Sequence, residues 1–193
     1  MQNRLTDKND NLLYDPQVSG YNPQYWKTVV GASDPSVTAD GIVLTNTTIE
    51  TYISHRYAGL LLNLKLPVDP QAAQNSFWGF GSVSLGNRGK TGFIIENQVF
   101  KAVAYDNVGT LIKSTTITWD ASWTNNTTTV FEVVWRETGV RWLINGVKVA
   151  EVSTLLDGFS AMPTNLGLPI MLAADANTVN MFLMDIRDLQ ART

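Results

Sequence analysis

The chain has 193 residues, of which 44% are hydrophobic, so it is long enough and apolar enough to bury the core of one domain. Its 14 Lys and Arg residues and 17 Asp and Glu residues give a net charge of −3, and no basic run occurs, which argues against a nucleic-acid-binding surface. No cysteine is present, which excludes disulfides, thiolate catalysis and cysteine metal sites. The longest apolar runs are too short to span a bilayer. We therefore expect neither nucleic acid nor membrane among the partners.

The first stretch, residues 1–24, is polar and rich in turn-forming residues, with Pro16 and Pro23 and no sustained periodicity. We interpret it as an irregular N-terminal arm in front of a single β-sandwich domain over residues 25–193. The arm is expected either to pack on its own domain or to dock on a neighbouring subunit. Its first residues have no apolar segment of the kind found in a signal peptide.

Beyond the arm, short stretches alternate apolar and polar residues, which is the pattern of strands with one face in a core. No segment shows sustained helical periodicity. Roughly a dozen short strands at this spacing predict an all-β, antiparallel sandwich or jelly roll. In chain order we expect them at Gly41–Leu44, Thr47–Arg56, Gly59–Leu66, Phe77–Leu85, Gly92–Asn97, Val99–Tyr105, Thr110–Trp119, Phe131–Val149 as three strands, Pro169–Ala173 and Asn180–Leu189.

The clearest strand pattern lies in Phe131–Val149. Apolar residues alternate with polar ones on both sides of the Thr138-Gly139 turn. Asn145-Gly146 then turns the chain again, because both residues tolerate the positive φ that a two-residue hairpin requires. This stretch predicts three antiparallel strands joined by tight turns.

The order of several short motifs resembles the concanavalin A-like lectin/glucanase superfamily, which includes LamG-like jelly-roll domains. The resemblance covers roughly Trp26 to Arg187. It rests on the co-linear order of Asp40–Leu44, Phe77–Gly81, Phe131–Trp135 with Val140–Gly146, and Met184–Arg187. It implies a twisted two-sheet jelly roll.

Glucanase members of that superfamily carry an E-x-D-x-x-E strand whose carboxylates act as nucleophile and general acid. Retaining hydrolysis needs two carboxyl groups about 5 Å apart, and same-face residues of one strand supply that spacing. No E-x-D-x-x-E occurs in this chain, and the nearest candidate strand, Gly92–Asn97, holds only Glu96. We therefore predict that the chain has no enzymatic activity.

Some glucanase members also hold a structural calcium between a glycine carbonyl near the N-terminus and an Asp of the last strand. By resemblance, Asp185 corresponds to that Asp and Gly41 to that glycine. Oxygen ligands of this kind suit calcium. The alternative is an Asp on the outer strand face that bonds a neighbouring turn.

Aromatic and amide side chains form a second candidate site. Sugars stack on exposed aromatic rings, while Asn and Arg bond their hydroxyl groups, and an anchor for a protein partner uses the same residue types. The alternative is a set of rim residues that cover the core. The candidates for glycan or partner contact are Trp78, Asn87, Arg88, Trp119 and Trp123.

Two functions compete at this point. The first is a structural or adhesion module of a larger particle, such as a capsid decoration or fibre protein on a virion surface, docked through its arm as a homo-oligomer or part of an assembly. The second is a glycan-binding, lectin-like module. A diverged glycoside hydrolase is a third, less favoured hypothesis. We favour the first, because the chain combines a polar arm, no cysteine and a surface rich in Asn, Thr and Gln.

Overall fold

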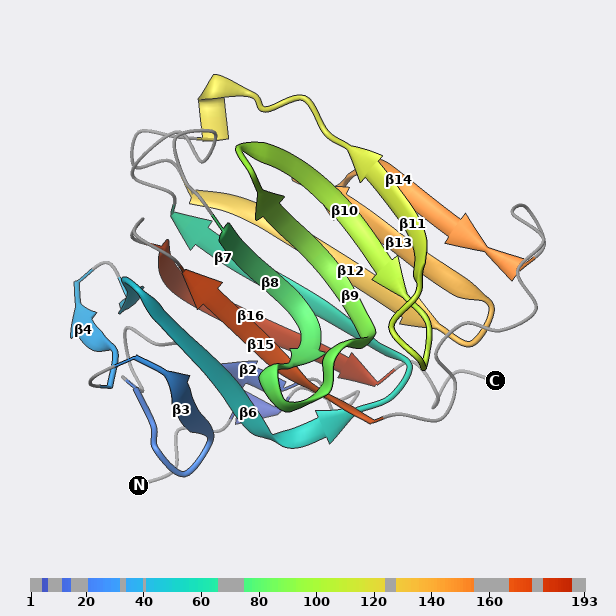
Figure 1. Ribbon diagram of the computed structural model, residues 1–193. Coiled ribbons are helices and arrows are strands. Elements are labelled where there is room, and N and C mark those ends of the chain that lie inside the picture. The colour runs from blue at the N-terminus through green and yellow to red at the C-terminus, as the bar shows by residue number, and fades with distance from the viewer. Residues whose placement is uncertain are drawn as a thin grey trace.

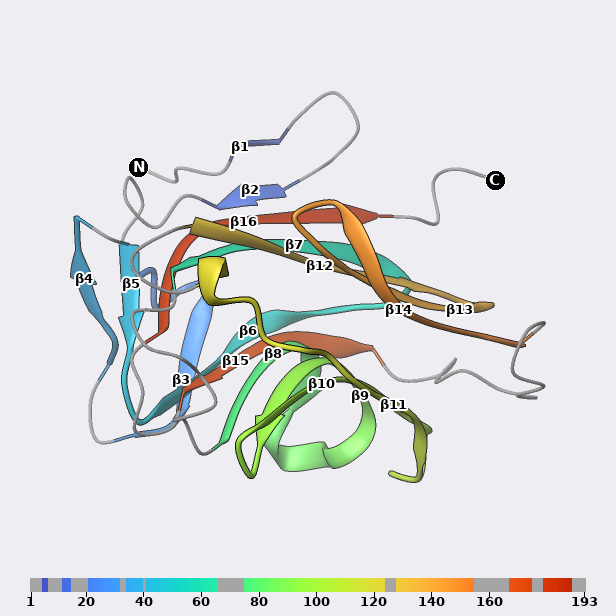
Figure 2. The same ribbon diagram turned by 90° about the horizontal axis from the view of Figure 1, so that it is seen from above.

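The computed structural model is an antiparallel β-sandwich of two stacked sheets (Figures 1 and 2). It describes residues 21–31, 34–39, 41–65, 75–123, 128–154 and 167–174, and the backbone of residues 5–6, 12–14 and 179–188. No helix within these ranges is long and apolar enough to cross a membrane. The predicted all-β jelly-roll architecture is confirmed.

Sheet A contains nine of the described strands, and its main path runs β1-β2-β16-β7-β12-β13-β14, while β5 pairs with β16 and with β4. The strands are β1 (Leu5–Thr6), β2 (Leu12–Tyr14), β4 (Ser36–Thr38), β5 (Gly41–Leu44), β7 (Ala58–Lys65), β12 (Thr128–Arg136), β13 (Gly139–Ile144), β14 (Val147–Ser153) and β16 (Val179–Asp188).

Sheet B contains seven described strands in the order β11-β10-β9-β8-β15-β6-β3. They are β3 (Trp26–Val30), β6 (Thr47–His55), β8 (Asn75–Ser82), β9 (Gly86–Glu96), β10 (Val99–Tyr105), β11 (Leu111–Thr116) and β15 (Leu168–Ala174). Two short 3₁₀ turns belong to the described chain: η2 (Val83–Leu85) joins β8 to β9, and η3 (Ala121–Trp123) follows β11.

An aromatic core lies between the two sheets. Trp78 of sheet B stacks on Phe93 and Phe100 and meets Phe131 of sheet A edge-on, with ring centroids 5.1 Å apart. Burying a large apolar side chain of this kind contributes roughly 1.5–3 kcal/mol. The largest fully buried side chains also include Trp26, Trp135, Trp142 and Phe80.

The three-strand prediction for Phe131–Val149 is confirmed by β12, β13 and β14. Residues Val133 and Trp142 face each other across the first hairpin, and both are buried. Asn145 has a φ of 50° in the second turn, and its side-chain oxygen accepts a hydrogen bond from the Val130 N–H. The alternation therefore reports correctly which side chains enter the core.

The N-terminal arm contributes two short strands to sheet A. β1 pairs with β2, and β2 pairs with β16 at Tyr14↔Met184, Leu13↔Asp185 and Leu12↔Ile186. Strands of two and three residues are too short to leave an alternating pattern, which is why the sequence reads as irregular there. Docking of the arm on another subunit stays a prediction.

Candidate functional site

The outer face of sheet B carries its own apolar cluster. Along β8, Trp78 and Phe80 point into the sandwich, so the alternate residues Phe77, Gly79 and Gly81 lie on the outer face. Phe77 packs there with Val103 and Met171, and the partly buried Ile94, Tyr105 and Ala173 surround these three residues. A sheet face that builds a second apolar cluster away from the core is a candidate ligand surface.

A groove of about 260 Å³ opens over this cluster. Its volume lies near the lower end of small-molecule sites, which span roughly 300–1,000 Å³. The floor is apolar, and the rim carries amide, hydroxyl and ammonium groups. The lining residues are Thr48, Asn75, Ser76, Phe77, Ser82, Val83, Gly86, Asn87, Lys90, Ile94, Met171 and Ala173.

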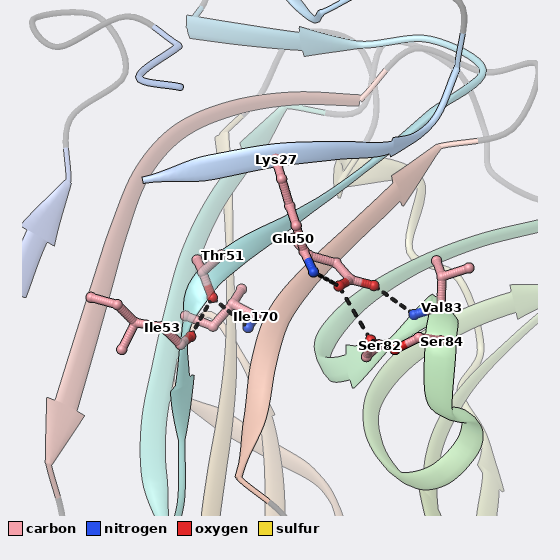
Figure 3. Close-up of polar contacts among 8 residues, drawn as sticks. All are labelled: Lys27, Glu50, Thr51, Ile53, Ser82, Val83, Ser84 and Ile170. Atoms are coloured by element: carbon pink, nitrogen blue, oxygen red, sulfur yellow. Dashed lines mark hydrogen bonds and ion pairs between the residues drawn. The ribbon is translucent and has the colours of Figure 1, made fainter. Parts of the chain in front are cut away.

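One wall of the groove is the connection between β8 and β9, which includes η2. Figure 2 shows this connection curling outward from sheet B. The buried carboxylate of Glu50, on β6, accepts hydrogen bonds from the Val83 N–H at 2.5 Å and from the Ser82 hydroxyl at 3.2 Å (Figure 3). Lys27 Nζ lies 3.1 Å from the same carboxylate. Glu50 therefore fastens the groove wall to the sheet.

Thr51, the residue after Glu50 on β6, stabilises the neighbouring strand β15. Its hydroxyl accepts the Ile170 N–H at 3.0 Å and donates to the Ile53 carbonyl at 2.7 Å (Figure 3). The pairing of β15 with β6 shifts register between Pro169 and Met171, so these bonds satisfy backbone groups where the regular ladder is interrupted. Met171 is thereby held in place on the groove floor.

Two facing glycines make room for Phe77 on the sheet. Gly79 and Gly92 are cross-strand partners. A Cβ atom at Gly92 would lie 2.5 Å from the Trp78 carbonyl oxygen and 2.9 Å from Phe77 Cζ. The Phe77 ring therefore rests close to bare backbone, which only glycine permits at this separation.

Lys90 reaches across the same floor from β9. Its Nζ lies 4.5 Å from the centroid of the Phe77 ring, a cation–π distance. Its stem passes Gly81, where a Cβ atom would come within 3.3 Å of Lys90 Cγ. Burial of the ammonium group lowers the pKa of Lys90, and the charge of Glu96 partly opposes this effect.

The carboxylates Glu50 and Glu96 do not form a catalytic pair. Glu96 pairs in register with Asn75 at one end of β8, whereas Glu50 bonds Ser82 at the other end. At about 3.3 Å per residue, this places the two glutamates on the order of 20 Å apart, far beyond the ~5 Å of a retaining pair. Glu96 instead pairs with Lys101 at 3.1 Å.

Of the residues predicted to contact a glycan or partner, Asn87 lines the groove. Arg88 is exposed beside it and donates from Nε to the Asn107 carbonyl at 3.1 Å. Trp78 is 1% exposed and belongs to the core, so neither face of its ring is open to a ligand.

The other two predicted contact residues lie together at the edge of the core. Trp119 and Trp123 meet edge-to-face at 5.1 Å and both pack on Phe100. Each is half-buried, and neither lines the groove. The structure thus places Trp119 and Trp123 in contact with each other but not in the groove that Asn87 lines.

The predicted calcium ligands lie on neighbouring strands. Ile42 pairs with Met181, so Gly41 on β5 lies three to four residues along β16 from Asp185. The side chain of Asp185 is outside the described residues. Within the ranges that are described, no group of three or more His, Cys, Asp or Glu residues could hold a metal ion. Calcium stays a prediction.

Sequence reasoning missed Lys90, Phe77, Met171 and Thr48 as groove residues. They come from strands β9, β8, β15 and β6, which are distant in the chain and share no motif. The available signal was the glycine spacing in β8 and β9. Glycines inside a strand mark a close approach of another group to the backbone.

Comparison of the structure with solved structures finds similar folds among carbohydrate-active proteins. No protein-family model matches the sequence, and no curated protein sequence matches it. The apo Crh5 transglycosylase matches with a TM-score of 0.72 at 14% identity, over 97% of this chain and 87% of that chain. A prokaryotic β-1,3-1,4-glucanase (lichenase) from a mouse hindgut metagenome gives 0.66 at 13% identity, over 92% of this chain and 98% of that chain. The carbohydrate-binding module CBM66 from Bacillus subtilis gives 0.58 at 11% identity, over 86% of this chain and 96% of that chain.

These matches correct two predictions from the sequence. The similar structures are transglycosylases, glucanases and a carbohydrate-binding module, which contradicts a structural or adhesion role on a virus particle. Most of them are enzymes, which contradicts the prediction that no enzymatic activity is present. A polar arm and the lack of cysteine are common to many protein classes, so they do not identify a virus-particle protein. The absence of an E-x-D-x-x-E strand excludes only one arrangement of catalytic groups.

Identities of 11–14% show a shared fold rather than a shared activity. This chain forms two stacked antiparallel sheets, and the match to the lichenase extends over nearly all of both chains. The chain therefore has the concanavalin A-like jelly-roll fold.

Proposed function

We propose that this protein is carbohydrate-active and binds a sugar chain in the groove on the outer face of sheet B. The observation that carries the proposal is the composition of the groove. An apolar floor of Phe77, Met171 and Ile94 is bordered by the polar side chains of Asn87 and Lys90. Sugars present apolar C–H faces and hydroxyl groups side by side, so a site of this composition matches both.

The fold comparisons support the same class of ligand. The similar structures include a lichenase, an endo-1,3-β-glucanase and a carbohydrate-binding module. A panel of polysaccharides for this chain therefore begins with β-1,3-glucan and β-1,3-1,4-glucan, with starch as an α-linked comparison.

The test is binding of this panel by the purified protein and by Asn87→Ala, measured by affinity gel electrophoresis. Asn87 is exposed in the groove wall, so its truncation removes an amide that bonds a ligand and leaves the core intact. We expect retardation by at least one polysaccharide, reduced several-fold in the variant.

The matched control is Asn97→Gly. Asn97 is exposed in the turn between β9 and β10, does not line the groove and has a φ of 50°, which glycine tolerates. The control should bind as the unaltered protein does. Equal binding by Asn87→Ala would remove the groove as the site, and no binding of any carbohydrate would contradict the function.

Cleavage or transfer of glycosidic bonds is the second candidate function, favoured by the transglycosylase and glucanases among the similar structures. Glu50 is the buried carboxylate that approaches the groove, through Ser82. Products of altered chain length, formed by the protein and lost in Glu50→Gln, would support this candidate. Unchanged substrate after prolonged incubation with the unaltered protein would contradict it.

A further inference from the structure

The groove contains a single charged residue among the described residues that line it, and that residue is Lys90. Its ammonium group lies over the Phe77 ring, on the apolar floor rather than at the solvent edge. The rest of the described lining offers amides, hydroxyls and apolar groups. The groove therefore has a positive charge, although the chain as a whole has a net charge of −3.

The nearby acidic side chains are engaged elsewhere. Glu50 pairs with Lys27 at 3.1 Å and bonds the backbone of Val83. Glu96 pairs with Lys101, also at 3.1 Å. Asp106 accepts the backbone N–H groups of Val108 and Thr110. Within the part of the chain that the structure describes, no carboxylate forms an ion pair with Lys90.

A partly buried cation without a counter-ion is unfavourable for the fold. Removing an ammonium group from water costs free energy unless an opposite charge compensates it, and the lowered pKa of Lys90 reflects that cost. Groups held in this way gather at functional sites more often than elsewhere. An anion delivered by a ligand would supply the missing partner and a charge-assisted hydrogen bond.

We propose that the groove recognises an anionic sugar unit, one that carries a carboxylate or a sulfate ester, with the anion bound at Lys90. The exposed amides around it, Asn87 and Asn75, bond the sugar hydroxyls, and the partly exposed Ile94 and Ala173 support the apolar face of the sugar ring. This inference rests on the proposed function and names the class of sugar that the same site selects.

The test compares three forms of one β-glucan oligosaccharide: neutral, oxidised to the carboxylate at C6, and sulfated. Titration calorimetry should show tighter binding of an anionic form, by roughly tenfold to a hundredfold, as one charge-assisted hydrogen bond predicts. The preference should shrink as salt is raised, because ions screen the attraction. Whichever of the two acidic forms binds more tightly identifies the preferred anion, carboxylate or sulfate.

Three variants locate the effect. The preference should disappear in Lys90→Met and persist in Lys90→Arg, which keeps the charge. It should also persist in Lys148→Met, because Lys148 is an exposed residue on β14 of sheet A, away from the groove. Because Lys90→Met also removes an unfavourable buried charge, its melting temperature should equal or exceed that of the unaltered protein. Such a result separates lost recognition from lost folding.

The outcomes that overturn the inference differ from those that overturn the function. Equal affinity for the neutral and acidic forms, unchanged in Lys90→Met, would refute anion recognition and leave sugar binding in the groove intact. Failure to bind any of the three forms, or any polysaccharide of the panel, would refute both.

Discussion

Phe77 is supported by residues that have no side chain of their own. Gly79 and Gly92 face each other beneath its ring, and Gly81 accommodates the stem of Lys90. The groove floor therefore depends on glycine at three positions of two adjacent strands. Each position can be tested separately.

Gly92→Ala should lower the free energy of unfolding by about 1–3 kcal/mol, the usual range for overpacking. The added methyl group would meet the Trp78 carbonyl oxygen at 2.5 Å, and backbone cannot move away cheaply. Gly81→Ala is the control, because its closest neighbours, Lys90 Cγ and Met171 Cε at 3.3 Å, are side-chain atoms that can shift more easily than backbone. Denaturant unfolding that gave equal losses for both variants would contradict this account.

The pH dependence of stability should reveal the buried charge of Lys90. Its folded pKa is lowered from 10.5, so the unfolded chain binds more protons between the lowered value and 10.5, and stability rises with pH in that window. Lys90→Met lacks this rise. We expect the variant to be the more stable protein near neutral pH and its advantage to close as pH approaches 10.5.

Melting temperatures of both proteins across that range provide the measurement. Burial is the larger effect on the pKa of Lys90 and the charge of Glu96 opposes it, so the sign of the expected change is that of burial. A difference between the two proteins that stays constant with pH, or widens as pH rises, would show that Lys90 is not under a burial penalty.

At the scale of elements, the connection between β8 and β9 is held by one carboxylate. Glu50→Ala would remove the acceptor of Val83 and Ser82 and leave Lys27 without its partner. Removing one member of a buried ion pair typically costs about 3–5 kcal/mol, and Lys27 can turn to solvent, so we expect a value near the lower end. Hydrogen exchange at Val83 should accelerate.

Glu96→Ala is the matched control for that change. The Glu96 side chain is 47% exposed and its ion pair with Lys101 is at the surface, so its loss should cost under about 1 kcal/mol. If the two variants were equally stable in denaturant, Glu50 could not be the residue that fastens the groove wall.

The elements differ in how well the sequence predicts them. Strands β12 to β14 alternate apolar and polar residues, so their inward faces follow directly from the pattern. Phe77–Gly81 is apolar on both faces, because one face meets the core and the other meets the groove cluster. Alternation cannot say which aromatic points inward in such a stretch, and the exposed role expected for Trp78 came from this ambiguity.

The groove could not be predicted from the sequence for a related reason. Its residues lie on β6, β8, β9 and β15, and the pairing of β15 with both β6 and β8 brings them together. A single sequence does not specify such long-range pairing. Lys90 belongs to no motif, and its significance comes from its position over Phe77 and from the lack of an ion-pair partner among the residues that the structure describes.

For the whole molecule, the N-terminal arm determines how sheet A ends. Deleting residues 1–20 would leave β16 without β2 and expose an unpaired strand edge, which favours association between molecules. We expect a lower melting temperature and a larger particle in light scattering. A full-length oligomer that dissociates on deletion would instead support docking of the arm on another subunit.

A structural calcium between Gly41 and Asp185 would also act on the whole molecule, by tying β5 to the last strand. An ion bound only by the folded state raises the melting temperature, by an amount that grows with its free concentration. We expect a fall in melting temperature with chelator and its recovery with calcium. Identical melting curves in chelator and in saturating calcium would exclude the site.

The most direct test of the account is to map where a carbohydrate binds. Amide chemical shifts of the isotope-labelled protein, followed during titration with the polysaccharide fragment that it binds best, report this residue by residue. We predict shifts concentrated on the groove strands of sheet B and on η2, with Lys90 and Asn87 among them. Shifts confined to sheet A, or none with any carbohydrate, would contradict a sugar site in the groove.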